Sequence, residues 1–364
     1  MKKVISTLIG MGIFSLALAD GHLKLEPLPD KPPQPKDNPT TPAKVELGKF
    51  LYFDPRLSGD GSTSCATCHT PQDAWGKNQV LSPAYPGNEH FRHSPTILNS
   101  AYNTLQFWDG RAKSLEEQAE KPILSPFEMN LHYDLMIERL KAISKYRQMF
   151  KKAFPDEPNP INLKNTVKAI ASFERTIVCN DTPLDKYLKG DKNALTEKQK
   201  LGLKLFTGKA GCIQCHNGAN LTDNQFHITG VPKSKAEDKV LTKITRNFVL
   251  IQAGFENPEK IDRDFGRYFL TKNPKDKGSF KTPTLRNVAL TPPYMHNGAF
   301  KTLQEVVEFY NKGGGDVPNK DPRLKPLNLT KAEKKALIAF LKALTCENVP
   351  FVEEPELPDY DKNY

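Results

Sequence analysis

Two copies of the pattern Cys-x-x-Cys-His are the clearest chemical signal in this 364-residue chain. Each copy supplies two thiols and one imidazole: Cys65, Cys68 and His69 in the first, and Cys212, Cys215 and His216 in the second. In this pattern two thioether bonds attach a c-type haem, and the histidine becomes a ligand of the haem iron. A redox-active cysteine pair or half of a zinc site would require the adjacent histidine to be accidental twice. The sequence therefore predicts two covalently bound haem c groups.

The segments before the two motifs resemble each other. Leu47-Gly48 precedes the first motif and Leu201-Gly202 precedes the second, each within a helical pattern, which indicates an internal repeat of a cytochrome c-like unit. Helical spacing of apolar residues dominates elsewhere, and the alternation typical of strands is nearly absent. We therefore predict a mostly α fold with two cytochrome c-like haem domains in tandem and little β structure.

The stretch "TLQEVVEFYNKGGG", residues 302–315, predicts a capped amphipathic helix. Thr302 and Glu305 form a capping box, the glycines end the helix, and Tyr310 lies on its apolar face. The same start signal occurs in two other helices, at Thr196 with Gln199 and at Thr330 with Glu333. From the pattern alone, Tyr310 is either a core residue with a polar tip or a residue whose oxygen does chemistry.

The N-terminus has the three-part form of a secretory signal peptide. "MKK" is followed by the apolar run "VISTLIGMGIFSLALA" and a small-residue site, so we expect cleavage near Ala19-Asp20 and export to a periplasm. The apolar run is short for a membrane span, and we expect a protein that is not membrane-embedded. The predicted organisation is a signal peptide (1–19), a proline-rich leader (20–43), an N-terminal haem domain (44–185), a C-terminal haem domain (186–345) and a tail that packs back on the domains (346–364).

The charge balance is basic. The formal net charge is +10 and becomes 50 − 42 = +8 if Lys2 and Lys3 leave with the signal peptide. A basic exported protein favours acidic partner proteins, and the dispersed lysines without a base-reading motif argue against nucleic acid. Two cysteines, Cys179 and Cys346, lie outside the haem motifs. An oxidising compartment permits a disulfide between them, but the sequence leaves open whether they are close.

Three longer stretches carry a family resemblance. "LGKFLYFDPRLS", "SPTILNSAYNTLQFWDGRAKSLEEQAEKPILSPFEM" and "FKTPTLRNVALTPPYMHNGAFKTLQEVVEFY", together with both haem motifs, resemble the bacterial di-haem cytochrome c peroxidase / MauG family. The resemblance extends over about residues 45–346. It implies a two-domain periplasmic protein with a peroxidatic haem in the N-terminal half and an electron-transferring haem in the C-terminal half.

The resemblance also implies residue roles. Trp108 in "FWDGR" matches the tryptophan between the haems, and Glu128 in "SPFEM" matches the acid–base carboxylate above the N-terminal haem. Gln118 and Pro122 match residues that line the same pocket. A positioned carboxylate suits O–O cleavage because a proton must move from the near oxygen of peroxide to the leaving one. Without the resemblance, Glu128 reads as a surface acid and Trp108 as a core aromatic.

The sixth ligand of the first haem departs from the usual pattern. Typical di-haem peroxidases supply a distal histidine sixteen residues after the proximal one, and here that position is Tyr85. His90 and His93 are close enough in sequence for a shifted loop to offer a ligand. We expect this haem to be open and five-coordinate, with ligation by His90, His93 or Tyr85 as the alternatives.

The second haem departs in another way. Where typical members have a methionine ligand fourteen residues after the position of His296, this chain has Tyr310, as MauG and its close relatives do. A thioether favours reduced iron, whereas a phenolate is a hard anionic donor that favours oxidised iron. Met295 is the competing ligand, although it does not fall on the family's ligand position.

Many members also hold a calcium ion between the domains. Thr291 and Pro293 match two of its carbonyl ligands, but His93 stands where the family has asparagine. Imidazole is a poor ligand for calcium, so the retention of this ion is left open.

The sequence therefore favours a periplasmic di-haem peroxidase or oxidase of the MauG kind. Hydrogen peroxide would react beside Glu128, and oxidising equivalents would pass through Trp108 to the Tyr310-ligated haem. The reductant would be an electron-donor protein, which could be a small cytochrome, a cupredoxin or a protein substrate with oxidisable side chains. The alternatives are a peroxide-detoxifying cytochrome c peroxidase and a non-catalytic di-haem electron carrier.

Overall fold

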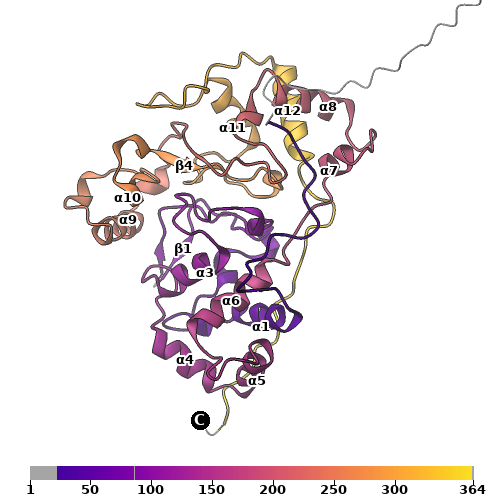
Figure 1. The fold of residues 1–364 in the computed structure, drawn as a ribbon. Coiled ribbons are helices and arrows are strands. Elements are labelled where there is room, and N and C mark those ends of the chain that lie inside the picture. The colour runs from indigo at the N-terminus through magenta and orange to yellow at the C-terminus, as the bar shows by residue number, and fades with distance from the viewer. Residues whose placement is uncertain (1–22, 86, 363–364) are drawn as a thin grey trace, which may run out of the picture.

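The computed structural model describes residues 23–85 and 87–362 of the chain. The predicted signal peptide, residues 1–19, and the start of the predicted leader lie outside this part. The described residues form helices joined by long loops, with two small antiparallel sheets (Figure 1). The prediction of a mostly α fold with little β structure is confirmed.

The helices and strands follow the chain in two groups. The N-terminal half contains α1 (Pro42–Phe53), α2 (Cys65–Cys68), β1 (Pro83–Ala84), β2 (Asn88–Glu89), α3 (Leu115–Leu124), α4 (Tyr133–Lys141), α5 (Ser144–Ala153) and α6 (Leu163–Glu174). The C-terminal half contains α7 (Pro183–Leu188), α8 (Glu197–Thr207), β3 (Phe226–Ile228), α9 (Val240–Gln252), α10 (Tyr268–Thr271), β4 (Ser279–Lys281), α11 (Leu303–Asn311) and α12 (Lys331–Lys342). Short 3₁₀ helices lie at Pro55–Leu57, Pro71–Asp73, Ser100–Tyr102, Cys212–Gln214, Lys235–Asp238, Pro258–Lys260, Pro274–Asp276 and Val288–Leu290.

The helix starts follow the sequence signals. In each of three helices, the hydroxyl of the capping threonine accepts the backbone N–H of the residue three positions later, and the side chain of that later residue accepts the backbone N–H of the threonine. The pairs are Thr302 with Glu305, Thr196 with Gln199 and Thr330 with Glu333. All three predicted capping boxes are confirmed. Each satisfies backbone N–H groups that the first turn of a helix leaves unpaired.

The packing of the helices explains why each copy of the repeat has a glycine within a helix. Helix α1 packs against α6, and α8 packs against α12. A Cβ at Gly48 would collide with the carbonyl oxygen of Ala169, and one at Gly202 would collide with that of Ala336. Glycine therefore lets both helix pairs approach closely, at a cost in helix propensity that the packing offsets.

The buried apolar side chains gather around these two helix pairs. One cluster draws on α1, α3, α4, α5 and α6, and another draws on α7, α8, α11 and α12. A smaller third cluster contains Phe91, Leu250 and Phe269. Each haem motif therefore follows a helix that belongs to its own core.

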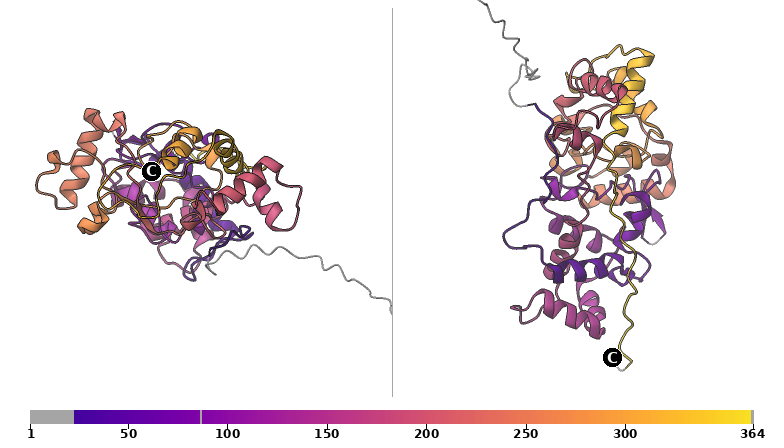
Figure 2. Two further views of the ribbon diagram at one scale, coloured as in Figure 1. Left: turned by 90° about the horizontal axis from the view of Figure 1, so that it is seen from above. Right: turned by 90° about the vertical axis from the view of Figure 1, so that its right-hand side faces the viewer.

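Two extended segments run across both halves. In the leader, Leu25 forms a parallel bridge with Gly218, and the buried Leu28 donates its N–H to Asp185 at 2.9 Å. At the other end, the C-terminal segment follows the N-terminal half to the bottom of the molecule (Figures 1 and 2). Near the start of this segment, Pro350 accepts the indole N–H of Trp75 at 2.7 Å.

The two cysteines outside the haem motifs form a disulfide. Cys179 follows α6 and Cys346 follows α12, and their Cα atoms are 5.9 Å apart. Both side chains are buried. The disulfide therefore joins the connection between the halves to the start of the C-terminal segment, which resolves the pairing that the sequence left open.

Candidate active site

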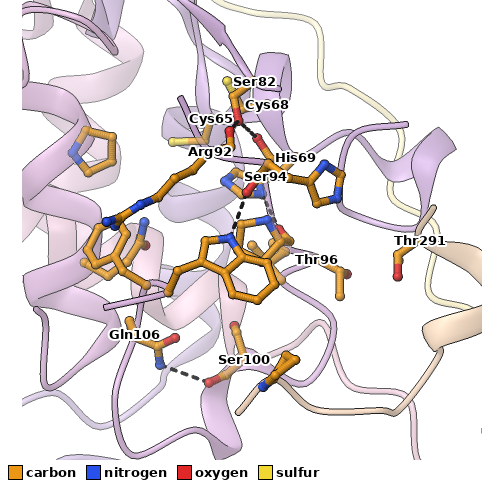
Figure 3. Close-up of a pocket in the computed structure, with 18 of the residues that line it drawn as sticks. Cys65, Cys68, His69, Ser82, Arg92, Ser94, Thr96, Ser100, Gln106 and Thr291 are labelled. Atoms are coloured by element: carbon orange, nitrogen blue, oxygen red, sulfur yellow. Dashed lines mark hydrogen bonds between the residues drawn. The ribbon is translucent and has the colours of Figure 1, made fainter. Parts of the chain in front are cut away.

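The first haem motif opens onto a cavity of about 250 Å³. Cys65 and Cys68 lie on α2, and His69 follows directly as the residue that ends this helix. Figure 3 shows these three side chains at one end of the pocket, with Ser100 and Gln106 at the other end. The side chains of the motif thus line one end of this cavity.

The imidazole of His69 is oriented for metal binding. Its Nδ1 lies 2.9 Å from the carbonyl oxygen of Pro95, a contact that assigns the proton to Nδ1. Burial lowers the pKa of His69 to about 4, so the ring is neutral. A neutral imidazole whose Nδ1–H donates to a carbonyl leaves Nε2 free as an iron ligand.

Helix α3 supplies one wall of the cavity. Ser114 caps the helix by accepting the N–H of Glu117 at 3.1 Å, and Gln118 and Pro122 both line the pocket. After α3 the chain turns back, because the N–H of Met129 donates to the carbonyl of Pro122 at 3.0 Å. This turn brings Glu128 to the same cavity as His69.

Trp108 lies where the two halves meet. Its indole N–H donates to the carbonyl of His93 at 2.9 Å, and its own carbonyl accepts the N–H of Lys281 at 2.8 Å. The indole also contacts His296 edge to face, with ring centroids 6.5 Å apart. Trp108 therefore joins the cavity wall of the first motif to a strand of the C-terminal half.

The three alternative distal ligands differ in position. His90 and His93 line the cavity, whereas Tyr85 is not among the lining residues. The Nδ1 of His93 lies 2.9 Å from the carbonyl of Gln79, and the Nδ1 of His90 accepts the N–H of Arg92 at 3.1 Å. Both imidazoles are thus engaged by neighbouring backbone groups.

The second haem motif repeats the arrangement of the first. Cys212 begins a 3₁₀ helix, and the Nδ1 of His216 lies 3.1 Å from the carbonyl oxygen of Leu221. Burial lowers the pKa of His216 to about 4. The imidazole of His216 is therefore the same tautomer as that of His69, and its Nε2 is available to bind iron.

Tyr310 lies on α11 near this second motif. Burial raises the pKa of the Tyr310 phenol, and the nearby charges of Cys215 and Cys212 raise it further. Those charges disappear when the two thiols become thioethers. The helix thus brings a phenol to the second motif, and an adjacent metal ion would favour its deprotonated form.

The residues present fit two haem groups. Both motifs pair partly buried thiols with a histidine that is oriented by a carbonyl, and the first opens onto a cavity. The buried ammonium of Lys281 also lines this cavity, and its nearest partner is the Thr282 carbonyl at 3.2 Å. An unpaired buried cation calls for an anion, and the carboxylate groups of a haem would supply one. The sequence interpretation did not single out Lys281, although it stands in the quoted "FKTPTLR".

The calcium site stays a prediction. Thr291 and Pro293, whose carbonyl oxygens it involves, both line the cavity of the first haem motif. At the position of the family's asparagine, the Nδ1 of His93 lies 2.9 Å from the carbonyl oxygen of Gln79. Imidazole is a poor ligand for calcium, so the prediction rests on the two carbonyl groups.

The fold and the two motifs define a tandem di-haem protein of the cytochrome c type. The family model described as di-haem cytochrome c peroxidase matches residues 42–193. The cytochrome-c peroxidase IdrP1 of Pseudomonas sp. (strain SCT) is 45% identical, over 93% of this chain and 90% of the relative. The methylamine utilization protein MauG of Methylorubrum extorquens is 39% identical, over 91% of this chain and 86% of the relative.

A solved structure shows the same likeness. It is a MauG-like protein associated with microbial copper homeostasis, with a TM-score of 0.76 and 31% sequence identity, over 88% of this chain and 95% of that one. This chain belongs to the di-haem cytochrome c peroxidase / MauG family. It is a haem-dependent peroxidase, and the family implies two haem c groups. Among the described helices, none combines the length and apolar character needed to cross a bilayer.

Proposed function

We propose that this protein reduces hydrogen peroxide beside the first haem motif with electrons that reach it through the second. The observation that carries the proposal is that Glu128, Gln118, Pro122 and Trp108 line the same cavity as His69. Reduction of one peroxide to two waters consumes two protons and two electrons. The site therefore needs both a proton carrier and an electron path, and the cavity wall offers a residue for each.

Glu128 is the proposed proton carrier. When bound at His69, the haem supplies the redox-active iron at which the O–O bond is broken. Glu128 accepts the proton of the oxygen nearer the iron and returns it to the leaving oxygen, which then departs as water. Gln118 offers a neutral amide for hydrogen bonding beside it. His69 would hold this haem from one side, and we propose that neither His90, His93 nor Tyr85 would bind its iron, which would leave the iron accessible to peroxide.

Trp108 is the proposed electron path. Its indole N–H and its carbonyl are bonded to different halves of the molecule, at His93 and Lys281. This fixes an oxidisable aromatic ring where the two halves of the molecule meet. The N-terminal domain, residues 44–185, is thus the peroxidatic unit, and the C-terminal domain, residues 186–345, is the electron-transfer unit.

Tyr310 is the proposed sixth ligand of the second iron. A phenolate favours the oxidised state of that iron, so the second haem is suited to holding oxidising equivalents. The reductant is then an electron-donor protein, including one whose own side chains are oxidised. The basic net charge of the chain, +10, or 50 − 42 = +8 without Lys2 and Lys3, favours a donor with an acidic surface.

A small c-type cytochrome is the second candidate donor. It is favoured by the 45% identity to a relative named cytochrome-c peroxidase IdrP1. In that case the protein detoxifies peroxide, and the second haem receives electrons one at a time from the cytochrome. A cupredoxin would serve the same purpose.

We also propose that the protein works in the periplasm after removal of residues 1–19. Support comes from the signal-peptide pattern and from the Cys179–Cys346 disulfide, because disulfides persist in oxidising compartments.

The experiment that tests the peroxide chemistry is the Glu128→Gln substitution. It keeps the shape of the side chain and removes its proton transfer, so the rate of reaction with hydrogen peroxide falls by ~10²–10⁴ in stopped-flow absorption. The matched control is Glu120→Gln, an exposed acid on α3, which leaves the rate unchanged. An unchanged rate in Glu128→Gln, with both haems attached, would remove Glu128 from the mechanism.

A further inference from the structure

The segment of residues 87–93, here called the distal segment, belongs to the N-terminal half in sequence. It contains β2 and ends with His90, Phe91, Arg92 and His93. Both histidines line the cavity of the first haem motif. The distal segment therefore carries two groups that bind iron well, next to a site that the proposed function requires to be open.

A buried ion pair joins the distal segment to the C-terminal half. Nε of Arg92 donates to Asp264 at 2.6 Å, and a terminal guanidinium nitrogen donates to the other oxygen of Asp264 at 3.0 Å. The remaining nitrogen donates to Asp109 at 2.6 Å. Burial opposes ionisation of Asp264, but the charge and hydrogen bonds of Arg92 outweigh it and lower the pKa of Asp264.

The geometry of this ion pair fixes position as well as charge. Two parallel N–H···O bonds between a planar guanidinium and a carboxylate hold both groups in one orientation. Asp264 is itself held, because it accepts the N–H of Gly266 at 2.8 Å. Asp109 directly follows Trp108, so one guanidinium connects the distal segment, the tryptophan loop and the C-terminal half.

Neighbouring residues of the distal segment contact the same half. Phe91 is buried in a small cluster with Leu250 of α9 and Phe269 of α10. Glu89 accepts hydrogen bonds from Lys239 at 2.8 Å and from Thr242 at 3.1 Å, and its carbonyl accepts one from Thr245 at 3.0 Å.

The last residue of the segment is held in the same way, because the N–H of His93 donates to the carbonyl of His296 at 2.7 Å. Helices α9 and α10 form a lobe beside β1 (Figure 1), and from this lobe Phe248 also contacts Phe127, next to Glu128. The same lobe therefore touches both the distal segment and the loop of the proposed acid–base residue.

Among residues 89–93, His90 alone makes none of these contacts with the C-terminal half. Its ring stacks on Phe91, with centroids 4.7 Å apart, and its Nδ1 accepts the N–H of Arg92 at 3.1 Å. The N–H of His90 donates to the carbonyl of Ser82 at 2.9 Å, within the N-terminal half. The ring, by contrast, is held by Phe91 and Arg92, both of which contact the C-terminal half, so their release frees the ring to turn within the cavity that it lines.

We propose that Asp264 is a positioning residue for peroxide reduction. Through Arg92 it holds the distal segment so that His90 does not bind the first haem iron, and the peroxide site stays open. The inference rests on the proposed function, in which this iron is the open, peroxidatic one. It assigns to the C-terminal half a second role beside electron transfer, which is to keep the active site of the other half accessible.

The test compares Asp264→Asn with the matched control Asp262→Asn, which removes the same charge from an exposed side chain two residues away. Both proteins are purified with their haems attached, and their ferric spin states are measured by electron paramagnetic resonance. In Asp264→Asn, part of the high-spin signal of the first haem converts to a low-spin, bis-histidine signal. The double variant Asp264→Asn/His90→Ala restores the high-spin signal. The control retains the wild-type spectrum.

Hydrogen–deuterium exchange gives a readout that needs no haem chemistry. Amides of the distal segment exchange about tenfold faster or more in Asp264→Asn than in the control, because hydrogen bonds to a charged partner are lost. If Asp264→Asn does not fold, Arg92→Lys, which keeps the charge and loses the paired geometry, is measured instead. Unchanged spin state and unchanged exchange would overturn the proposal. A wild-type protein that is low-spin at both haems would contradict the proposed open site, while the exchange experiment would still decide whether Asp264 positions the segment.

Discussion

At the scale of single residues, we propose that Tyr310 determines which electron donor the second haem suits. Replacing it with methionine exchanges a hard anionic oxygen for a thioether, which favours reduced iron. We expect Tyr310→Met to raise the reduction potential of the second haem in a potentiometric titration and to produce a methionine–iron absorption band. Tyr310→Phe separates loss of the phenolate from gain of the thioether. An unchanged potential in both variants would show that Tyr310 is not the ligand.

Glu174 is a buried acid on the cavity wall that the sequence interpretation did not identify. Burial raises its pKa from 4.5 to about 8, and its Oε2 has no hydrogen-bond partner. Above pH 4.5 the unfolded chain releases this proton while the folded chain keeps it until about pH 8. The folded state therefore binds more protons in that window, and the contribution of Glu174 to stability falls as pH rises.

The fall in the stability contribution of Glu174 with rising pH leads to a testable prediction. The neutral, isosteric variant Glu174→Gln becomes more stable relative to wild type as pH increases from 4.5 to about 8. Melting temperatures of the two proteins, measured across this range, check it. The exposed variant Glu120→Gln serves as the control and follows wild type. A constant difference between Glu174→Gln and wild type would show that Glu174 ionises normally in the folded protein.

Helices and connecting segments hold these residues in place. Each haem motif follows a helix that contacts its partner at a glycine, Gly48 against α6 and Gly202 against α12. The C-terminal segment then crosses back to the N-terminal half, where Arg56 donates to the carbonyl of Pro358 at 2.6 Å. The disulfide stands at the start of this crossing.

Removing the disulfide tests how much the crossing contributes. Cys179 and Cys346 are 167 residues apart in sequence, so their bond strongly restricts the unfolded chain. We expect the double variant Cys179→Ala/Cys346→Ala to lose ~2–4 kcal/mol of stability in denaturant unfolding. Limited proteolysis within residues 347–358 should also become faster. Wild type treated with a reductant reproduces both effects, and equal stability with and without the bond would contradict the account.

Considered as a whole molecule, the protein is only partly predictable from its sequence. The haem motifs, the Leu-Gly helices and the three capping boxes involve residues close together in the chain, so their patterns are visible in sequence. The pair Arg92–Asp264 joins residues 172 positions apart, and neither belongs to a periodic pattern. Lys281 and Glu174 were missed for a related reason, because only the folded chain shows that they border the cavity.

The division of the chain into two units is also only partly visible in the sequence, because it depends on contacts between residues that are far apart in the chain. The helical repeat locates two haem units, but no local signal shows that α9 and α10 of the second unit hold a segment of the first. Side-chain packing between distant elements creates that contact. The molecule is thus better described as two units that both line one cavity than as two independent domains.

The central claim is that an open first haem reacts with peroxide and shares the oxidising equivalents with a Tyr310-ligated second haem. The most direct measurement is electron paramagnetic resonance of the fully oxidised protein before and after one equivalent of hydrogen peroxide. We predict one high-spin and one low-spin ferric signal at first, and a joint decline of both signals after peroxide is added. Two low-spin signals that do not respond to peroxide would contradict the account and would fit a di-haem electron carrier.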